Sequence, residues 1–282
     1  MQRHKSANKG KEVTDLTQSR IDTSGYYILK WLGVLAMALG LISSIAVSSK
    51  PVHNIMYCIG ETAFPIFVFL LSESYHFTKN RVWHFLKIMI ISYISEIPYD
   101  YITQGQLISF KKQNPCITLL LCYIVCIVIN SDLKSKLKLF YKSEKLQKVM
   151  SKSLKLLMLT GIGIAAVSLN LQYDWYAILL ISLLELSRRH SNVFTALSIA
   201  AYSLIAYQGS FLNCCAVLSA VPIMVMLKIG RHSKLNDNKS IPDSLLTSKA
   251  SVYITRISYP IMLTAISLIR NSFLKLLVSI QG

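Results

Sequence analysis

Two carboxylates stand close together at the end of an apolar run, in the stretch ISEIPYDYI at 94–102. Glu96 and Asp100 are four positions apart, so they share one face of a helix. Pro98 lies between them and tends to kink a helix, because it frees a backbone carbonyl one turn earlier. Ionisable groups at membrane depth are costly and usually face protein or a water-filled cavity. The stretch therefore predicts the wall of a polar cavity. The alternative is a helix end at the membrane interface, where Asp100 is simply solvated.

Three more ionisable groups are expected on the same, outer side of the membrane. Glu61 lies near the outer end of the second apolar run and His53 lies at its outer mouth, while Asp174 lies in the short link NLQYDWY. Histidine titrates near neutral pH, which suits a general base. We predict that the catalytic residues come from this group, namely Glu96, His53, Asp100 and Glu61.

The segment LLSESYHFTKNR at 70–81 places polar residues at the inner end of the second run. Glu73 and His76 are three positions apart and share a helix face. One interpretation is a cytosolic donor site in which Lys79 and Arg81 bind phosphates. The other is a capped, charged helix end, and the residues alone do not decide between them. We predict substrate binding for Glu73, His76, Lys79 and Arg81, together with Asp174 and Arg256, which lies inside the last apolar run.

Apolar helices must position all of these residues. The chain has 282 residues, of which 53% are hydrophobic, and a mean hydropathy of +0.46. Only 15% are charged, against roughly 25% in average soluble proteins. Its apolar runs are long enough to cross a hydrocarbon core about 30 Å thick. The pattern predicts an all-α, polytopic transmembrane helical bundle of about nine spans, at 26–47, 53–74, 84–101, 115–130, 154–171, 175–187, 193–208, 211–228 and 252–270.

The charges predict the topology of this bundle. The formal charge is +17, and the cations lie between apolar runs rather than on one domain, which argues against nucleic-acid binding. They concentrate in every second connection, so the positive-inside rule places the N-terminus in the cytoplasm and the C-terminus outside. We therefore expect a multi-pass protein of the cell (inner, cytoplasmic) membrane, with the lipid bilayer as its surroundings. The basic link 131–155 is either an amphipathic helix held by anionic lipids or a topology-setting loop without a partner.

The remaining motifs do not select a reaction. Six cysteines, at 58, 116, 122, 126, 214 and 215, lie in or beside apolar runs, with no CxxC pair and no zinc spacing. We therefore expect no metal site, and cysteines that act as small apolar fillers. The sequence also lacks a phosphate-cradling glycine-rich loop, HExxH, GxSxG and kinase signatures, so the residues alone do not choose a chemistry.

Two motifs follow one another closely, GETAFPIFVFLLSESYHFTKNR at 60–81 and ISYISEIPYDYI at 91–102. Together they resemble the TraX family, membrane proteins named for N-terminal acetylation of a conjugative pilin. Weaker resemblances follow in the family's order, namely LKWLGVLAMALGLI (29–42), NPCITLLL (114–121), LQYDWYAILLI (171–181) and VYITRISYPIML (252–263). The last of these adds Tyr259, in its Tyr-Pro pair, to the predicted substrate-binding residues.

The resemblance implies an integral membrane acyltransferase domain over 26–270, between a cytoplasmic tail (1–25) and a C-terminal tail (271–282). Its donor would be cytosolic acetyl-CoA or another acyl-CoA, with no metal. Its acceptor would be a peptide, a pilin-like protein or an envelope component, modified by N- or O-acetylation.

This chain departs from the family at three positions. The family's Asp-His pair in the first span is Gly40-Leu41 here, its histidine after Tyr-Pro-x is Met262, and its Gly-Arg is Gly60-Glu61. Three interpretations remain open. In the first, the enzyme uses His53 or Glu96 as its general base. In the second, the protein still binds its ligands but has lost catalysis. In the third, the fold serves transport, assembly, export or immunity to a membrane-active peptide.

Overall fold

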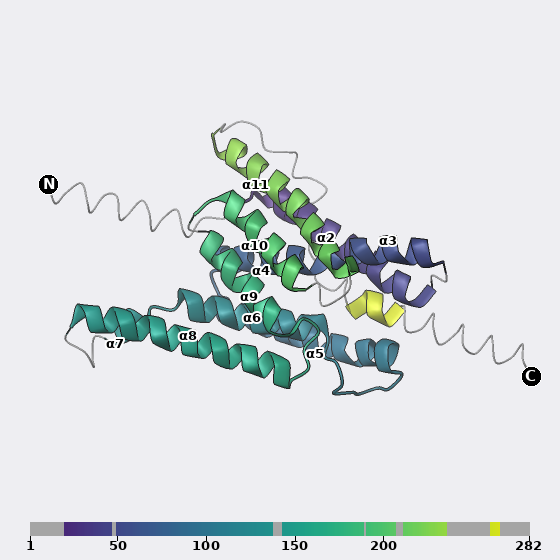
Figure 1. Cartoon of the computed structure of the whole chain (residues 1–282), viewed down its shortest axis with the longest axis horizontal. Helices are drawn as coiled ribbons and strands as arrows, with labels where there is room; N and C mark the ends of the chain where they lie inside the picture. The colour runs from purple at the N-terminus through teal and green to yellow at the C-terminus, as the bar shows by residue number, and fades with distance from the viewer. Residues whose placement is uncertain are drawn as a thin grey trace, which may run out of the picture.

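The computed structural model describes residues 20–46, 49–137, 143–188, 190–206, 211–235 and 260–265. Within these residues the chain is all-helical, and its only β-type pairing is an isolated bridge between Gln113 and Leu171. The helices lie side by side, most of them along the long axis of the molecule (Figure 1). They are α2 (Thr23–Ala46), α3 (Lys50–Glu61), α4 (Ala63–Phe77), α5 (Arg81–Gln104), α6 (Pro115–Asn130), α7 (Leu133–Leu137), α8 (Glu144–Ser168), α9 (Asp174–Ser187), α10 (Asn192–Ile205), the 3₁₀ helix η1 (Phe211–Ser219) and α11 (Ala220–Leu235).

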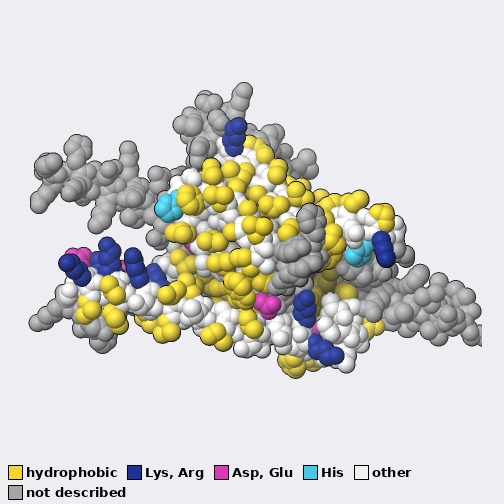
Figure 2. Space-filling view, in the orientation of Figure 1, with side chains coloured by type: hydrophobic (Ala, Val, Ile, Leu, Met, Phe, Trp, Pro, Cys, Tyr) yellow, Lys and Arg dark blue, Asp and Glu magenta, His cyan; other side chains and the backbone are white. Residues whose placement is uncertain are grey.

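Among the described residues, four segments are long and apolar enough to cross a membrane: Ser24–Ser43, Lys50–Phe77, Glu144–Ser168 and Leu212–Gly230. Hydrophobic side chains cover the middle of the face shown in Figure 2, and lysines and arginines lie toward its ends. The chain is therefore an all-helical membrane protein with four candidate spans. The first eight predicted spans fall on helical segments, and most of the ninth lies outside the described residues. The count of nine crossings and the orientation of the termini stay predictions.

The second predicted span is broken into α3 and α4. Pro65 has no N–H to donate to the carbonyl of Glu61, so the hydrogen-bond ladder is interrupted there. Thr62 forms the turn between the two helices, and its hydroxyl donates to the Ile59 carbonyl at 2.7 Å. Glu61 thus becomes the last residue of a helix instead of an interior one. Pro98, in contrast, lies inside α5, which continues to a left-handed C-cap at Gly105.

The basic link 131–155 is only partly a link. Its second half, from Glu144 onward, is the first part of α8, a helix of 25 residues that runs on into the predicted fifth span. The helical interpretation is confirmed for Leu133–Leu137 and from Glu144 onward, but neither interpretation predicted that the helix continues into the fifth span. The reason is physical: lysine has a long apolar stem that lies along a helix while its charge reaches water, and no glycine or proline interrupts residues 144–160.

A disulfide joins Cys58 in α3 to Cys215 in η1, 157 residues apart in the sequence. The expectation that all six cysteines are apolar fillers is therefore wrong for these two. It holds for Cys122 and Cys126, which are buried and free. A pairing over this separation leaves no local pattern in the sequence, which is why spacing did not reveal it.

Candidate functional site

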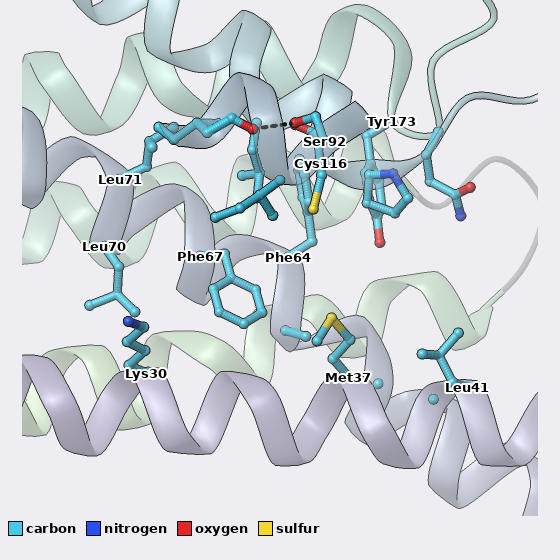
Figure 3. A pocket seen from close by; sticks show the side chains of 18 of the residues that line it. Lys30, Met37, Leu41, Phe64, Phe67, Leu70, Leu71, Ser92, Cys116 and Tyr173 are labelled. Carbon is cyan, nitrogen blue, oxygen red and sulfur yellow. Dashed lines mark hydrogen bonds between the residues drawn. The ribbon is translucent and has the colours of Figure 1, made fainter. Parts of the chain in front are cut away.

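A cavity of about 350 Å³ lies inside the bundle, between α2, α3, α4, α5, the start of α6 and the link before α9. Most of its wall is apolar, and Figure 3 shows side chains from α2 facing side chains from α4 across it. The helix break at Pro65 places Phe64 and Glu61 in this wall. The apolar wall includes Met37, Leu41, Phe64, Phe67, Leu70, Leu71, Ile88, Ile91 and Leu119.

The cavity extends along much of the length of α2. Tyr26 and Leu41, both in its wall, are fifteen residues apart on this helix, which corresponds to about 22 Å at 1.5 Å per residue. This is a large part of a hydrocarbon core of about 30 Å. Polar groups occur toward both ends of the cavity. We name these the His84 end, with Tyr26, Lys30, Ser74 and His84, and the Glu61 end, with Tyr57, Glu61, Tyr99, Gln172 and Tyr173.

At the His84 end, a histidine and a serine are paired. His84 Nε2 lies 3.2 Å from Ser74 Oγ, which also donates to the Leu71 carbonyl at 2.9 Å. Lys30 points from α2 toward Leu70 nearby (Figure 3). Arg81 is one turn before His84 on α5 and lies over the ring of Tyr75, 4.5 Å from its centroid. His84 was missed in the sequence because no acid stands beside it; its place inside an apolar helix was the available signal.

At the Glu61 end, a carboxylate is surrounded by tyrosines. Tyr57 is one turn before Glu61 on α3 and within its electrostatic reach, and Tyr173 lies against the ring of Phe64, with the centroids 3.6 Å apart. Lys112 lies within electrostatic reach of both Glu61 and Asp174. Two predicted site residues, from α3 and from the start of α9, are therefore both under the electrostatic influence of one lysine.

Glu96 and Asp100 lie behind the wall at this same end. Among the described residues Glu96 is not part of the cavity lining, although Tyr99 and Cys116, which do line it, are within its electrostatic reach. Asp100 is fully buried, and its Oδ2 accepts from the Ser109 backbone N–H at 2.6 Å. The alternative of a solvated helix end at Asp100 is thus wrong, because the 105–113 loop folds back and covers the carboxylate.

His53 does not reach the cavity. It lies on the outer face of α3, partly exposed, with its ring stacked on Tyr57 at 6.0 Å between centroids and Nδ1 3.4 Å from Asn54 Oδ1. Its role as a general base stays a prediction, and His53 is not among the described residues that line the cavity. Arg256 and Tyr259 lie outside the described residues.

Glu73 and His76 belong to a buried ion cluster at the same end of the bundle as His84. Glu73 is fully buried and pairs with Arg20 and Arg188, each at 2.6 Å. His76 Nε2 lies 2.9 Å from Glu185 Oε2. Neither Glu73 nor His76 is among the described residues that line the cavity. This favours a structural role for these two residues.

Lys79, in the turn between α4 and α5, and Arg81, the first residue of α5, are exposed. They remain accessible to a ligand such as a phosphate, so donor binding stays open for this pair. No group of three or more His, Cys, Asp or Glu side chains that could hold a metal ion occurs in the described part of the chain.

The three departures from the TraX pattern meet at the Glu61 end. Gly40, Leu41 and Glu61 all line the cavity, and the backbones of Gly40 and Gly60 touch, since a Cβ on Gly60 would lie 2.6 Å from Gly40 Cα. The segment 260–265 packs here too, because Leu263, the residue after Met262, lies in a cluster with Leu41, Met37 and Tyr99. Positions far apart in the sequence are thus neighbours in one place.

Comparison with known proteins supports the family resemblance. The family model described as TraX protein matches residues 26–270, which is most of the chain. No curated protein and no solved structure matches the chain. On the strength of the family match, the chain is a member of the TraX protein family.

Proposed function

We propose that this protein is a multi-pass inner-membrane acyltransferase, which receives an acyl group from acyl-CoA at the His84 end and passes it to an acceptor at the Glu61 end. The observation that carries this proposal is a cavity whose wall extends from the His84 end to the Glu61 end. A cavity with a cation near one end and a carboxylate near the other provides a path for an acyl group through the bilayer. TraX membership supports a membrane protein of the pilin-acetylation type.

The residues at the His84 end fit an acyl-CoA donor. Arg81 and Lys79 are exposed beside this end and would hold phosphate groups. His84 and Ser74 lie just inside, where they can hydrogen-bond an amide carbonyl of the pantetheine arm, whose thioester end then extends along the cavity toward Glu61. The apolar wall then excludes water from the thioester, which otherwise hydrolyses.

The residues at the Glu61 end fit transfer to an acceptor. The acceptor nitrogen or oxygen attacks the thioester carbon; a C–N or C–O bond forms, the C–S bond breaks, and CoA leaves as a thiolate. Glu61 takes the proton that the acceptor loses and returns it to the thiolate. General-base catalysis of this kind contributes about 10²–10⁴-fold.

The disulfide supports the predicted orientation. Cys58 is one turn before Glu61 on α3, and disulfides persist in oxidising compartments outside the cytoplasm. The Glu61 end then faces outward, as the positive-inside rule also predicts. Ser49→Cys should react with a membrane-impermeant maleimide in intact cells, above the labelling of wild type, and Lys79→Cys only after lysis. The reverse pattern would invert the topology.

The enzymatic proposal is tested by comparing acyl-modified proteins in cells that express wild type, Glu61→Gln or the control Glu144→Gln. Glu144 is exposed and pairs with Lys134, far from the cavity. We expect a modified acceptor with wild type and with the control, and at least about a hundredfold less with Glu61→Gln. If mass spectrometry finds no modification that depends on this chain, the enzymatic proposal fails.

A second candidate function is a non-catalytic membrane partner in peptide or pilus assembly, export or immunity. One observation favours it: a glycine, a leucine and a methionine occupy the positions where the family carries ionisable residues. In this case the cellular phenotype should survive Glu61→Gln but fail with Phe64→Ala, which removes a buried side chain from α4.

A further inference from the structure

The first turns of α8 carry three lysines along one edge of the helix. Lys145, Lys148 and Lys152 are three and four positions apart, so their side chains are neighbours. All three are exposed, and none forms an ion pair among the described residues. Glu144, the only acidic residue of α8, is paired with Lys134 of α7 instead. Because like charges at this spacing repel each other, anions from outside the chain would stabilise this edge. Figure 2 shows lysine or arginine side chains in a row at the end of the molecule where α7 and the start of α8 lie.

The same turns of α8 also have an exposed apolar edge. Leu146, Val149 and Met150 are 45%, 60% and 37% exposed, whereas Gln147 and Ser151 are buried against the protein. Only 11% of the apolar window of α8 is buried inside the structure, the smallest share among the four candidate spans. An apolar edge beside a row of lysines is typical of a helix at a membrane surface, where the apolar side chains contact acyl chains and the lysines reach the headgroups.

The length of α8 places these lysines at the level of the phospholipid headgroups. A hydrocarbon core about 30 Å thick takes about 20 helical residues, which, counted back from Ser168, leaves residues 144–148 of this helix outside the core. Lys152 lies one turn deeper and reaches the headgroups with its long side chain. Lys155, the next lysine along the helix, is deeper still and instead donates to the Ile129 carbonyl at 2.7 Å. The charged edge therefore ends where the hydrocarbon core begins.

With the N-terminus in the cytoplasm, α8 begins at the inner leaflet, where anionic phospholipids attract basic segments. We infer that Lys145, Lys148 and Lys152 bind the phosphate groups of anionic phospholipids in this leaflet. The exposed apolar edge distinguishes a membrane lipid from a soluble phosphate, because only the lipid covers that edge with its acyl chains. Since α8 is the least buried of the candidate spans, lipid bound at its start should stabilise its position in the bundle. The inference does not depend on the proposed function.

The test measures thermal unfolding of the full chain in neutral detergent micelles, titrated with phosphatidylglycerol or, as the reference, with zwitterionic phosphatidylcholine. A lipid that binds the folded protein raises the transition temperature. We expect a saturable rise with phosphatidylglycerol for wild type, and at least about a tenfold weaker apparent affinity when all three lysines are replaced by glutamine. The matched control replaces the same three lysines by arginine, which keeps the charge, and should bind as wild type does.

Each outcome supports or overturns the lipid assignment. An equal rise with both lipids, or an unchanged response of the glutamine variant, would mean that the lysines are simply solvated, and this overturns the inference. An equal rise with inorganic phosphate would indicate a site for soluble anions and would also overturn it. If the triple glutamine variant does not fold, Lys148→Gln should still weaken the response several-fold, whereas Lys111→Gln, which removes an exposed charge from the 105–113 loop, should not. Lipid binding without any acylated acceptor in cells would remove the proposed function and leave this inference standing.

Discussion

The buried carboxylates at the two ends of the bundle differ in how many of their oxygens have hydrogen-bond partners. At the His84 end every carboxylate oxygen of Glu73 and Glu185 has a partner. Glu73 Oε1 accepts from Arg20 and Arg188, and its Oε2 from the Arg20 backbone N–H. Glu185 accepts from Ser72 on one oxygen, and its other oxygen is paired with Asn130 and His76. At the opposite end, Glu96 has no such partner in the described residues and Asp100 has one, the Ser109 N–H.

We expect the paired acids to be structural and the unpaired acids to be functional. A carboxylate whose oxygens are all paired joins helices that are distant in sequence: Glu73 connects α4 to α9 and to the residues before α2. A buried carboxylate with unpaired oxygens forms no stabilising contact through them, and its desolvation lowers the free energy of unfolding. Unpaired groups next to a cavity are therefore where we expect ligands. Variants at the two ends should therefore differ in stability, and the expected changes range from large at the paired acids to small at the cavity wall.

Glu73→Gln should have the largest effect on stability. It leaves the nearly buried Arg188 beside a neutral side chain, and breaking a buried pair by removing one partner costs about 3–5 kcal/mol. The measurement is thermal unfolding in nanodiscs, with Glu144→Gln at the exposed Lys134 pair as the control, expected to change stability very little. A variant as stable as wild type would show that the paired cluster is not structural.

Gly60→Ala should have an intermediate effect. A Cβ there would lie 2.6 Å from Gly40 Cα and 3.2 Å from Gly40 N, so the backbones of α2 and α3 must separate. Overpacking of this kind costs about 1–3 kcal/mol. The matched control is Gly161→Ala in α8, where nothing lies within 4 Å of the added Cβ, and where alanine should stabilise the helix by roughly 0.5–1 kcal/mol. Equal transition temperatures for the two variants would contradict the close contact at the Glu61 end.

Local patterns in the sequence predicted the helices well. The span expected at 115–130 is α6 with the same bounds, because Asn114 caps the helix by accepting from the Cys116 N–H and Pro115 follows at its first position. The break between α3 and α4 was not predicted. It falls inside one continuous apolar run, and proline is common enough in membrane helices that Pro65 alone did not mark an end.

The site was predictable only in part, because its contacts join distant segments. Glu61, Glu96, Asp100 and Asp174 were chosen as rare ionisable groups in apolar surroundings, and the structure places all four toward one end of the bundle. The sequence contains no signal that Arg20 and Arg188 pair with Glu73, at separations of 53 and 115 residues. It also gave no reason to pair His84 with Ser74, although both lie within one helical hairpin.

Leu41→His should have the smallest effect on stability and the most informative effect on chemistry. Leu41 lines the cavity at the Glu61 end, so an introduced imidazole has space and a carboxylate close by, as at the corresponding position of the family pattern. If transfer takes place at this end, acetyl transfer from labelled acetyl-CoA in nanodiscs should rise by about tenfold or more. Leu41→Gln is the control, since it has similar polarity without a titratable ring. A gain with both variants, or with neither, would mean that the unpaired acids at this end do not mark the place of acyl transfer, and the contrast between the two ends would then be one of folding alone.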